Sequence, residues 1–252
     1  MATSKKATPT AKRAPQATRR RSDQLRKVEI IRGFTNNVPG SVLIRCGRTH
    51  VLCTATIENG VPHWKRGQGT GWLTAEYDML PGSTQRRRPR NRLKMDGRTY
   101  EIQRLIGRSL RAVVDMEVLG EHSILIDCDV LQADGGTRSA SITGSYVALC
   151  DCLRYALREK IVAKSPLKGS VAAVSVGVLD GKAVLDLDYA LDMAADVDFN
   201  VVMTGDGRFV EIQGTAESST FSRPELDRLL RLAARGIKQL TEHQLRALRQ
   251  KV

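Results

Sequence analysis

The sequence predicts an α+β protein built from two sheet-and-helix units that follow one another along the chain. Strand-like runs precede amphipathic helical runs in both halves, which is typical of sheets backed by helices. A break with Pro166 and Gly169 separates the halves. The 252 residues, 41% of them hydrophobic, can form one large domain or two small fused ones. We expect a first domain over residues 28–160 and a second over 161–252, behind a basic tail over 1–27.

Strands dominate the start of the first half. Runs rich in apolar and β-branched residues predict strands over residues 28–34, 40–46, 49–58, 72–79 and 123–131. A helix is expected over 98–116, because Ile102, Leu105 and Leu110 fall on one face. A second helix is expected over 139–160 for the same reason.

The second half begins with the strongest hairpin signal of the chain, Asp180-Gly181. The expected strands cover residues 171–179, 183–189, 199–204 and 209–213. Ser222 and Glu225 then have the spacing of a capping box, which predicts the start of a last, amphipathic helix.

Positive charge is concentrated in two segments. The net charge is +13, of which residues 1–28 contribute +8 and residues 86–98 contribute +6, so the remainder is nearly neutral. The first segment has almost no apolar residues, which predicts disorder and excludes a secretion signal. No window approaches eighteen apolar residues, so no membrane span is expected.

The cysteines exclude two further classes of protein. Five cysteines, an odd number, lie within apolar strand or helix patterns, and none forms a paired two-spacer motif. We therefore expect buried, reduced thiols in a cytoplasmic protein, not a disulfide scaffold or a zinc site.

The turn over residues 133–138 (ADGGTR) joins a predicted strand to a predicted helix. Gly135 and Gly136 let the backbone approach a bound group, and the helix start offers N–H donors to an anion. Thr137 adds a hydroxyl and Arg138 a planar fork suited to phosphate. The alternative is an ordinary tight turn with a solvated arginine.

An acidic segment over residues 186–198 holds five aspartates and no lysine or arginine. Such clustering is unfavourable unless a cation or water screens the charges. Asp192 and Asp198 are candidates for holding Mg²⁺, provided that the chain between them is extended or looped. The alternative is a solvated acidic loop.

A basic, almost non-apolar run is a candidate contact for a polyanion, with a solvated charge run as its alternative. Its cations are Arg86, Arg87, Arg88, Arg90, Arg92 and Lys94. No serine lies in a nucleophile elbow, and no cysteine has an evident histidine partner. Together with the turn and the aspartates, this pattern indicates phosphoryl chemistry on a polyanion without a covalent intermediate.

Four long runs, 71–84, 97–115, 127–144 and 211–217, resemble the bacterial ribonuclease PH family, in order and in register. The resemblance implies two fused α/β-layer subdomains: a core related to a ribosomal-protein domain, and a smaller carboxy-terminal unit. It implies a phosphorolytic 3′-to-5′ exoribonuclease that is a tRNA nucleotidyltransferase. Such enzymes trim tRNA precursors, and we include rRNA as a further substrate. They release nucleoside diphosphates and form a homohexamer of three dimers.

The resemblance also assigns residues, and with RNA as the polyanion the basic run over 86–94 becomes the candidate RNA contact. The resemblance assigns the binding of inorganic phosphate, the co-substrate, to Arg98, Gly136, Thr137 and Arg138. The catalytic or Mg²⁺-binding positions fall on Asp192 and Asp198, and whether Asp198 is a metal ligand or a proton donor stays open. The chain departs from the usual pattern at positions near these aspartates, and the changes make the acidic site less charged. These positions are Leu191, Met193 and Phe199.

Two other functions are compatible with the pattern. One is a non-catalytic RNA-binding ring subunit of exosome type, which the retained arginines and aspartates disfavour. The other is a broader degradative phosphorylase, which carries a duplicated core and extra RNA-binding domains, for which this chain is too short.

Overall fold

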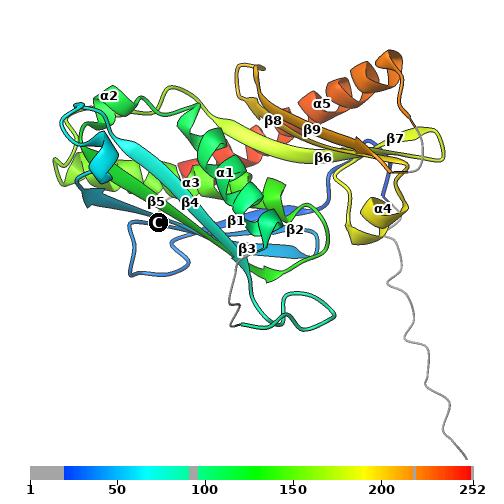
Figure 1. The fold of residues 1–252 in the computed structure, drawn as a ribbon, viewed down its shortest axis with the longest axis horizontal. Helices are drawn as coiled ribbons and strands as arrows, with labels where there is room; N and C mark the ends of the chain where they lie inside the picture. The colour runs from blue at the N-terminus through cyan, green and yellow to red at the C-terminus, as the bar shows by residue number, and fades with distance from the viewer. Residues whose placement is uncertain (1–19, 91–95, 218–219, 251–252) are drawn as a thin grey trace, which may run out of the picture.

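Two sheets, each covered by helices, lie side by side in the computed structural model, which describes residues 20–90, 96–217 and 220–250 (Figure 1). The first sheet has the order β1-β2-β3-β5-β4. Its strands are β1 (Val28–Arg32), β2 (Gly40–Cys46), β3 (Thr49–Asn59), β5 (His122–Gln132) and β4 (Trp72–Met79). All neighbours are antiparallel except β4 and β5, which are parallel.

Two helices cover the first sheet. Helix α3 (Thr137–Arg158) packs on β2 and β3, and α1 (Gly97–Arg111) packs on β4. The apolar side of α1 supplies Ile102, Leu105 and Leu110 to this core, as the helical spacing predicted.

The second sheet has the order β7-β6-β8-β9 and is antiparallel throughout. Its strands are β7 (Lys182–Leu185), β6 (Val171–Leu179), β8 (Val197–Thr204) and β9 (Phe209–Ala216). Helix α5 (Arg223–Arg249) packs across this sheet, and the predicted capping box at Ser222 and Glu225 is present (Figure 1). Leu229 and Ile237 of α5 are buried in the same core as Val201 of β8.

Helix α3 also joins the two halves, because it contacts both β6 and α5. Buried Gln244 of α5 donates from Nε2 to the carbonyl oxygens of Thr143 and Val171, each at 2.9 Å. The hydroxyl of Thr143 in turn accepts the backbone N–H of Ala173 at 3.2 Å. Buried polar contacts of this kind fix the halves relative to one another, since leaving such groups unpaired costs free energy.

Three strands have the predicted bounds: β2, β4 and β6. The strand expected over 183–189 is shorter, because β7 ends at Leu185 and Asp188 caps the short helix α4 (Tyr189–Ala194). The helix expected over 98–116 ends at Arg111, and Asp115 caps a separate short helix, α2 (Met116–Leu119). One short 3-10 helix, η1 (His63–Lys65), was not predicted. The division at residue 160 stays a prediction.

The disorder expected over the basic tail does not extend to its last residues. Residues 1–19 lie outside the described residues, but residues 20–27 pack against the protein. Leu25 belongs to the second core, and Arg26 is only 8% exposed. The backbone N–H of Leu185 donates to the carbonyl of Ser22 at 2.7 Å. The composition of the tail did not reveal this contact, because Leu25 and Arg26 are only two residues within a segment that is otherwise mostly charged or polar.

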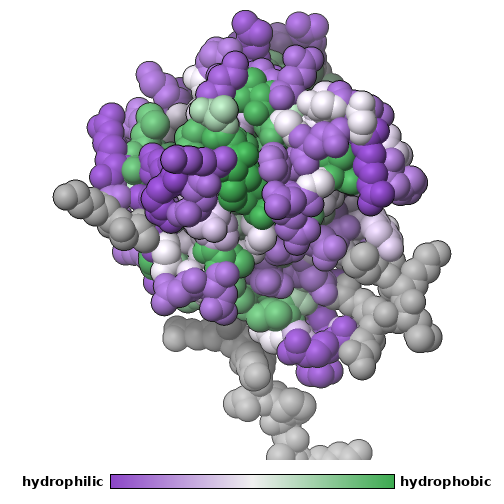
Figure 2. Space-filling view, turned by 90° about the vertical axis from the view of Figure 1, so that its left-hand side faces the viewer, coloured by the Kyte–Doolittle hydropathy of each residue, from purple (hydrophilic) through white to green (hydrophobic). Residues whose placement is uncertain are grey.

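All five cysteines are buried and free, as predicted. Burial raises the pKa of Cys46 to about 12, so this thiol is protonated and unreactive at neutral pH. Among the described residues, no helix has the length and apolar content needed to cross a bilayer. Figure 2 shows hydrophilic side chains over much of the face at the α2 end, with smaller apolar patches between them.

Candidate active site between a glycine turn and an acidic helix

The turn before α3 lies against the acidic segment. Gly135 and Gly136 have φ values of +73° and +64°, which favour glycine. A Cβ atom on Gly135 would stand 2.6 Å from the carbonyl carbon of Asp188. Glycine at this position therefore permits both the turn and its close approach to the acidic segment.

Thr137 and Tyr77 link the turn to the first sheet. The Thr137 hydroxyl is buried and lies 2.8 Å from the Tyr77 hydroxyl. Burial raises the pKa of Tyr77, while the bond with Thr137 and the nearby charge of Arg98 oppose that shift. Arg98, in the first turn of α1, is therefore close to the start of α3, although the two are far apart in sequence.

Arg138 connects three elements. Its Nη1 donates to Oε1 of Gln213 on β9 at 2.9 Å and approaches Oε1 of Glu101 on α1 at 3.4 Å. Its side chain is 17% exposed, so the guanidinium is largely sheltered but still reachable from solvent. These partners fix the orientation of the cation.

The two aspartates named from the sequence belong to the same electrostatic environment as the arginines. Asp192 lies exposed on α4, and Asp198 lies half-buried on β8. Loss of hydration raises the pKa of both carboxyls, and for Asp198 the negative charges of Asp192 and Glu217 add to the rise. Arg138 opposes the rise at both, and Arg98 opposes it at Asp192. Cations from α1 and α3 therefore face carboxylates from α4 and β8.

Arg26 is a buried residue of this site that sequence reasoning missed. Its Nη2 and Nε donate to Asp186 at 2.7 and 3.1 Å, and its backbone N–H donates to the same carboxylate at 2.8 Å. Its Nη1 donates to the carbonyl oxygen of Asp134 at 2.7 Å, beside the glycine turn. Nothing in the local pattern distinguished it from the tail arginines except the adjacent Leu25.

Comparisons with known proteins agree with this geometry. A model of domain 1 of the 3′ exoribonuclease family matches residues 24–154, and a model of its domain 2 matches residues 169–236. The ribonuclease PH of Corynebacterium efficiens is 57% identical over 231 residues, covering 91% of this chain and 94% of that protein. The chain belongs to the ribonuclease PH family.

A second ribonuclease PH, from Corynebacterium diphtheriae, is 58% identical over 230 residues, covering 90% of this chain and 95% of the relative. Among solved structures, the Archaeoglobus fulgidus exosome with RNA bound to the active site has a TM-score of 0.76 at 21% identity. It covers 88% of this chain and 90% of that one. An archaeal exosome core has a TM-score of 0.74, also at 21% identity, with coverage of 90% and 89%. These structures show the ribonuclease PH-type α+β fold expected from the sequence.

Four of the five aspartates in the acidic segment of this ribonuclease PH-family chain form two groups. Asp186 is buried and paired with Arg26 and Arg20, and Asp188 caps α4 through the N–H of Leu191 at 3.0 Å. These two aspartates are structural, whereas Asp192 and Asp198 face the cations. The chain between Asp192 and Asp198 is helical up to Ala194 and becomes extended at Ala195. An extended or looped path over the whole of this stretch was expected from the sequence.

Within the described parts of the chain, no group of three or more His, Cys, Asp or Glu side chains forms a metal cluster. Mg²⁺ nevertheless needs only one or two carboxylates when water and substrate phosphate fill its other positions. The mutual repulsion between Asp192 and Asp198 is the kind that a divalent cation relieves. The donor set therefore fits Mg²⁺ bound together with a phosphate-bearing substrate.

The basic run is only partly available as an RNA contact. Arg86, Arg87 and Arg90 are exposed. Arg88 is half-buried, and its Nη2 lies 3.0 Å from the carboxylate of Asp96, which also caps α1. Arg92 and Lys94 lie outside the described residues.

Proposed function

We propose that this chain is a phosphate-dependent 3′-to-5′ exoribonuclease, a tRNA nucleotidyltransferase that trims the 3′ ends of tRNA precursors and of rRNA. Its substrate is RNA and its co-substrate is inorganic phosphate. The membership of the ribonuclease PH family supports this activity. The site assignment rests on the position of Arg138, which lies close enough to Asp192 and Asp198 for its positive charge to lower the pKa of both carboxyls.

Inorganic phosphate binds at the start of α3, between Arg98 and Arg138. A hydrogen bond to a charged partner contributes about 1.5–3 kcal/mol, whereas a helix terminus contributes about 0.3–1 kcal/mol. The two arginines therefore dominate binding, and the backbone of Gly136 and Thr137 orients the anion. Because Arg138 is already held by Gln213 and Glu101, it needs little reorganisation to receive phosphate.

Phosphorolysis requires two anions to meet. A phosphate oxygen attacks the phosphorus of the last internucleotide linkage, and the bond from that phosphorus to the 3′ oxygen breaks. The products are a nucleoside diphosphate and an RNA shortened by one residue, whose 3′ oxygen takes up a proton. Arg98 and Arg138 hold the attacking anion, so that this approach is electrostatically feasible.

Asp192 and Asp198 would hold Mg²⁺, which when bound supplies neutralisation of the charge that develops on the scissile phosphate. The raised pKa of Asp198 also suits proton donation to the leaving 3′ oxygen. The two roles are separable, because a metal ligand must be ionised and a proton donor must not be.

We place the protein in the cytoplasm and propose that it assembles as a homohexamer, a trimer of dimers. The likeness to exosome structures supports a shared fold, and the family supports the ring. Mass photometry of the purified protein tests the assembly, with a hexamer as the expected species and a monomer as the contradicting one.

One assay tests the activity. Purified protein is incubated with a tRNA precursor, Mg²⁺ and phosphate, and the expected product is nucleoside diphosphate. Monophosphate released without added phosphate would indicate a hydrolase. No release at all would favour the non-catalytic RNA-binding subunit. The variant Asp192→Asn/Asp198→Asn is the matched control and is expected to release nothing while still binding RNA.

A further inference from the structure

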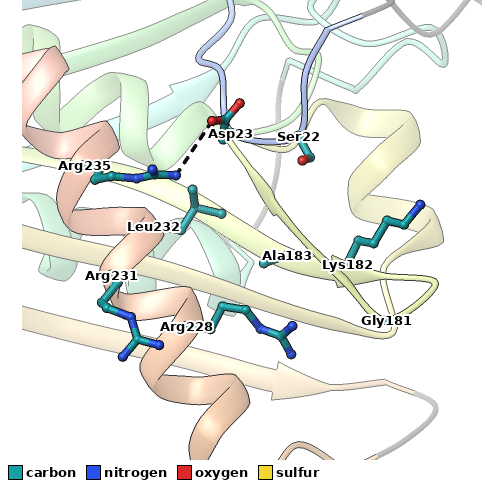
Figure 3. A pocket seen from close by; sticks show the side chains of 9 residues that line it. All are labelled: Ser22, Asp23, Gly181, Lys182, Ala183, Arg228, Arg231, Leu232 and Arg235. Carbon is teal, nitrogen blue, oxygen red and sulfur yellow. Dashed lines mark ion pairs between the residues drawn. The ribbon is translucent and has the colours of Figure 1, made fainter.

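A pocket of about 530 Å³ whose lining includes neither Asp192 nor Asp198 lies between α5, the β6–β7 turn and the segment that enters β1 (Figure 3). Leu232 and Ala183 provide apolar surface in it. Its remaining lining residues are Ser22, Asp23, Gly181, Lys182, Arg228, Arg231 and Arg235. Four of them are cationic and only Asp23 is acidic, so the pocket is strongly positive.

The three arginines follow helical spacing. Arg228, Arg231 and Arg235 are exposed and three and four positions apart, so they share one face of α5. A rise of about 1.5 Å per residue spreads them over about 10 Å. Their side chains extend from the helix as Lys182 does from the neighbouring β7 (Figure 3).

Acidic partners neutralise little of this charge. Asp23 pairs with Arg21 at 2.9 Å and is 3.9 Å from Arg235. Within the described residues, Arg228, Arg231 and Lys182 form no ion pair within 4.0 Å. Hydrogen bonds with Ser222 lower the pKa of Glu225, and Arg228 lowers it further by its charge alone. An anionic ligand would neutralise the positive charge that remains along this face.

The pocket is distinct from the candidate active site. Side chains of β8 alternate, and Val197, Phe199 and Val201 pack in the core with α5. Asp198 and its carboxylate therefore lie on the opposite face of the sheet from α5. Edge strand β7 connects the two places, because it begins at Lys182 in the pocket and leads into the acidic segment after Leu185.

We propose that this pocket is a second RNA-binding site, which holds the sugar-phosphate backbone of the substrate upstream of its 3′ end. The inference rests on the proposed function, which supplies RNA as the polyanion. Strand β7 alone spans about 10–13 Å over its four residues, and the segment from Leu185 to Asp192 lengthens the path, so several nucleotides of single-stranded RNA are needed to cover it. In this proposal a long RNA has its 3′ end at Asp192 and its upstream backbone along the β7 edge, which leads to the pocket at Lys182.

The chemistry of the pocket favours backbone contact without base readout. Long cationic side chains recognise phosphate oxygens, and such contacts carry no sequence information. The lining contains no aromatic side chain on which a base could stack. The site therefore contributes affinity for long substrates of any sequence.

The test compares two triple variants that remove equal positive charge. Lys182→Gln/Arg228→Gln/Arg231→Gln removes three of the four pocket cations, and Arg223→Gln/Arg246→Gln/Arg249→Gln removes three cations from the ends of the same helix. Binding of a fluorescent tRNA precursor is titrated by anisotropy, without phosphate, over a range of salt concentrations. Because the pocket variant has three fewer cations to neutralise single-strand phosphates, its log–log salt slope should become shallower by about 2.

Two further readouts decide between outcomes. The pocket variant should raise the KM for the tRNA precursor but not for a trinucleotide, which is too short to reach α5. Equal slopes for the two variants would overturn the proposal, as would an equal loss on the trinucleotide. Altered assembly of the pocket variant, by mass photometry, would overturn it in favour of a subunit interface. Because the titration needs no turnover, its failure is distinguishable from a failure of the proposed activity.

Discussion

Arg26 and Asp186 form a buried ion pair that joins the N-terminal segment to both sides of the candidate site. The guanidinium contacts both oxygens of Asp186, at 2.7 and 3.1 Å, and each side chain is less than 10% exposed. From the same guanidinium, Nη1 reaches the carbonyl of Asp134 at 2.7 Å. One side chain therefore ties the glycine turn to the acidic segment, which lies more than fifty residues later.

Breaking this pair should destabilise the protein. Removing one partner of a buried pair leaves the other charge uncompensated, which costs about 3–5 kcal/mol. We expect Arg26→Ala and Asp186→Asn each to lower the free energy of unfolding by that amount, measured by chemical denaturation. The exposed pair of Arg223 and Asp227 provides the control, because Asp227→Asn should cost less than about 1 kcal/mol. Equal effects of Asp186→Asn and Asp227→Asn would contradict the structural role of Arg26.

The close approach at Gly135 predicts a second effect on stability and activity. Gly135→Ala places a Cβ in a left-handed backbone and 2.6 Å from Asp188, so the turn or α4 must move. Gly67→Ala is the matched control, since Gly67 has φ +74° but no atom within 4 Å of a new Cβ. In both variants, backbone strain should lower the free energy of unfolding by about 1 kcal/mol. Only Gly135→Ala should lower the free energy of unfolding by more than this amount and also raise the KM for phosphate.

The sequence predicted helices and strands well where a single local cause, such as an apolar run or a capping box, determines the element. Strand β6 is buried along nearly its whole length and has the bounds predicted from its apolar run. The capping box at Ser222 and Glu225 is a contact three residues apart, so the sequence contains all of its information. Asp188 showed the limit of this approach: its side chain starts α4, whereas the apolar residues around it favoured a continued strand.

The candidate site was predictable only in part, because its contacts are long-range. The sequence pointed to Arg138, Asp192 and Asp198 through glycines, charge clustering and family resemblance. Arg26 gave no such signal: its significance comes from partners 108 and 160 residues away. The same holds for Gln213, which orients Arg138 across 75 residues. Propensity and periodicity report on neighbours in the chain, so neither could find these contacts.

Replacing Arg98 should weaken phosphate binding without disturbing the fold. Arg98 is exposed in the first turn of α1, so Arg98→Gln leaves the buried face of the helix intact. Loss of one charge-assisted hydrogen bond, at about 1.5–3 kcal/mol, should raise the KM for phosphate about 10- to 150-fold. Arg104→Gln, at an exposed position of the same helix, is the control and should leave this KM unchanged. An unchanged KM in Arg98→Gln would remove this residue from the phosphate site.

The raised pKa of Asp198 predicts a trade between stability and activity. The folded state holds this proton to a higher pH than the unfolded state does, so stability falls as pH rises from the ordinary value of 3.8 through the raised one. Above that window, Asp198→Asn should be more stable than the parent protein by about 0.5–1 kcal/mol in the absence of divalent cations. The variant should have lost its activity.

Added Mg²⁺ should reverse this order, because a cation that binds the folded state stabilises it. Thermal unfolding with and without Mg²⁺ measures both effects: Tm should rise for the parent protein and stay constant for Asp198→Asn. A matching rise in the variant would exclude Asp198 as a metal ligand and leave proton donation as its role.

The exposed arginines of the basic run, Arg86, Arg87 and Arg90, should set part of the salt dependence of RNA binding. Arg88 is excluded from the test, because its contact with Asp96 supports the start of α1, and its loss would confuse two effects. Arg86→Ser/Arg87→Ser/Arg90→Ser removes three exposed cations, and with about 0.7 units of slope per single-strand phosphate the log–log slope should become shallower by about 2. Arg158→Ser, at the exposed end of α3, should leave the slope unchanged. If the triple variant keeps the slope of the parent protein, the loop is a solvated charge run and the RNA follows another path.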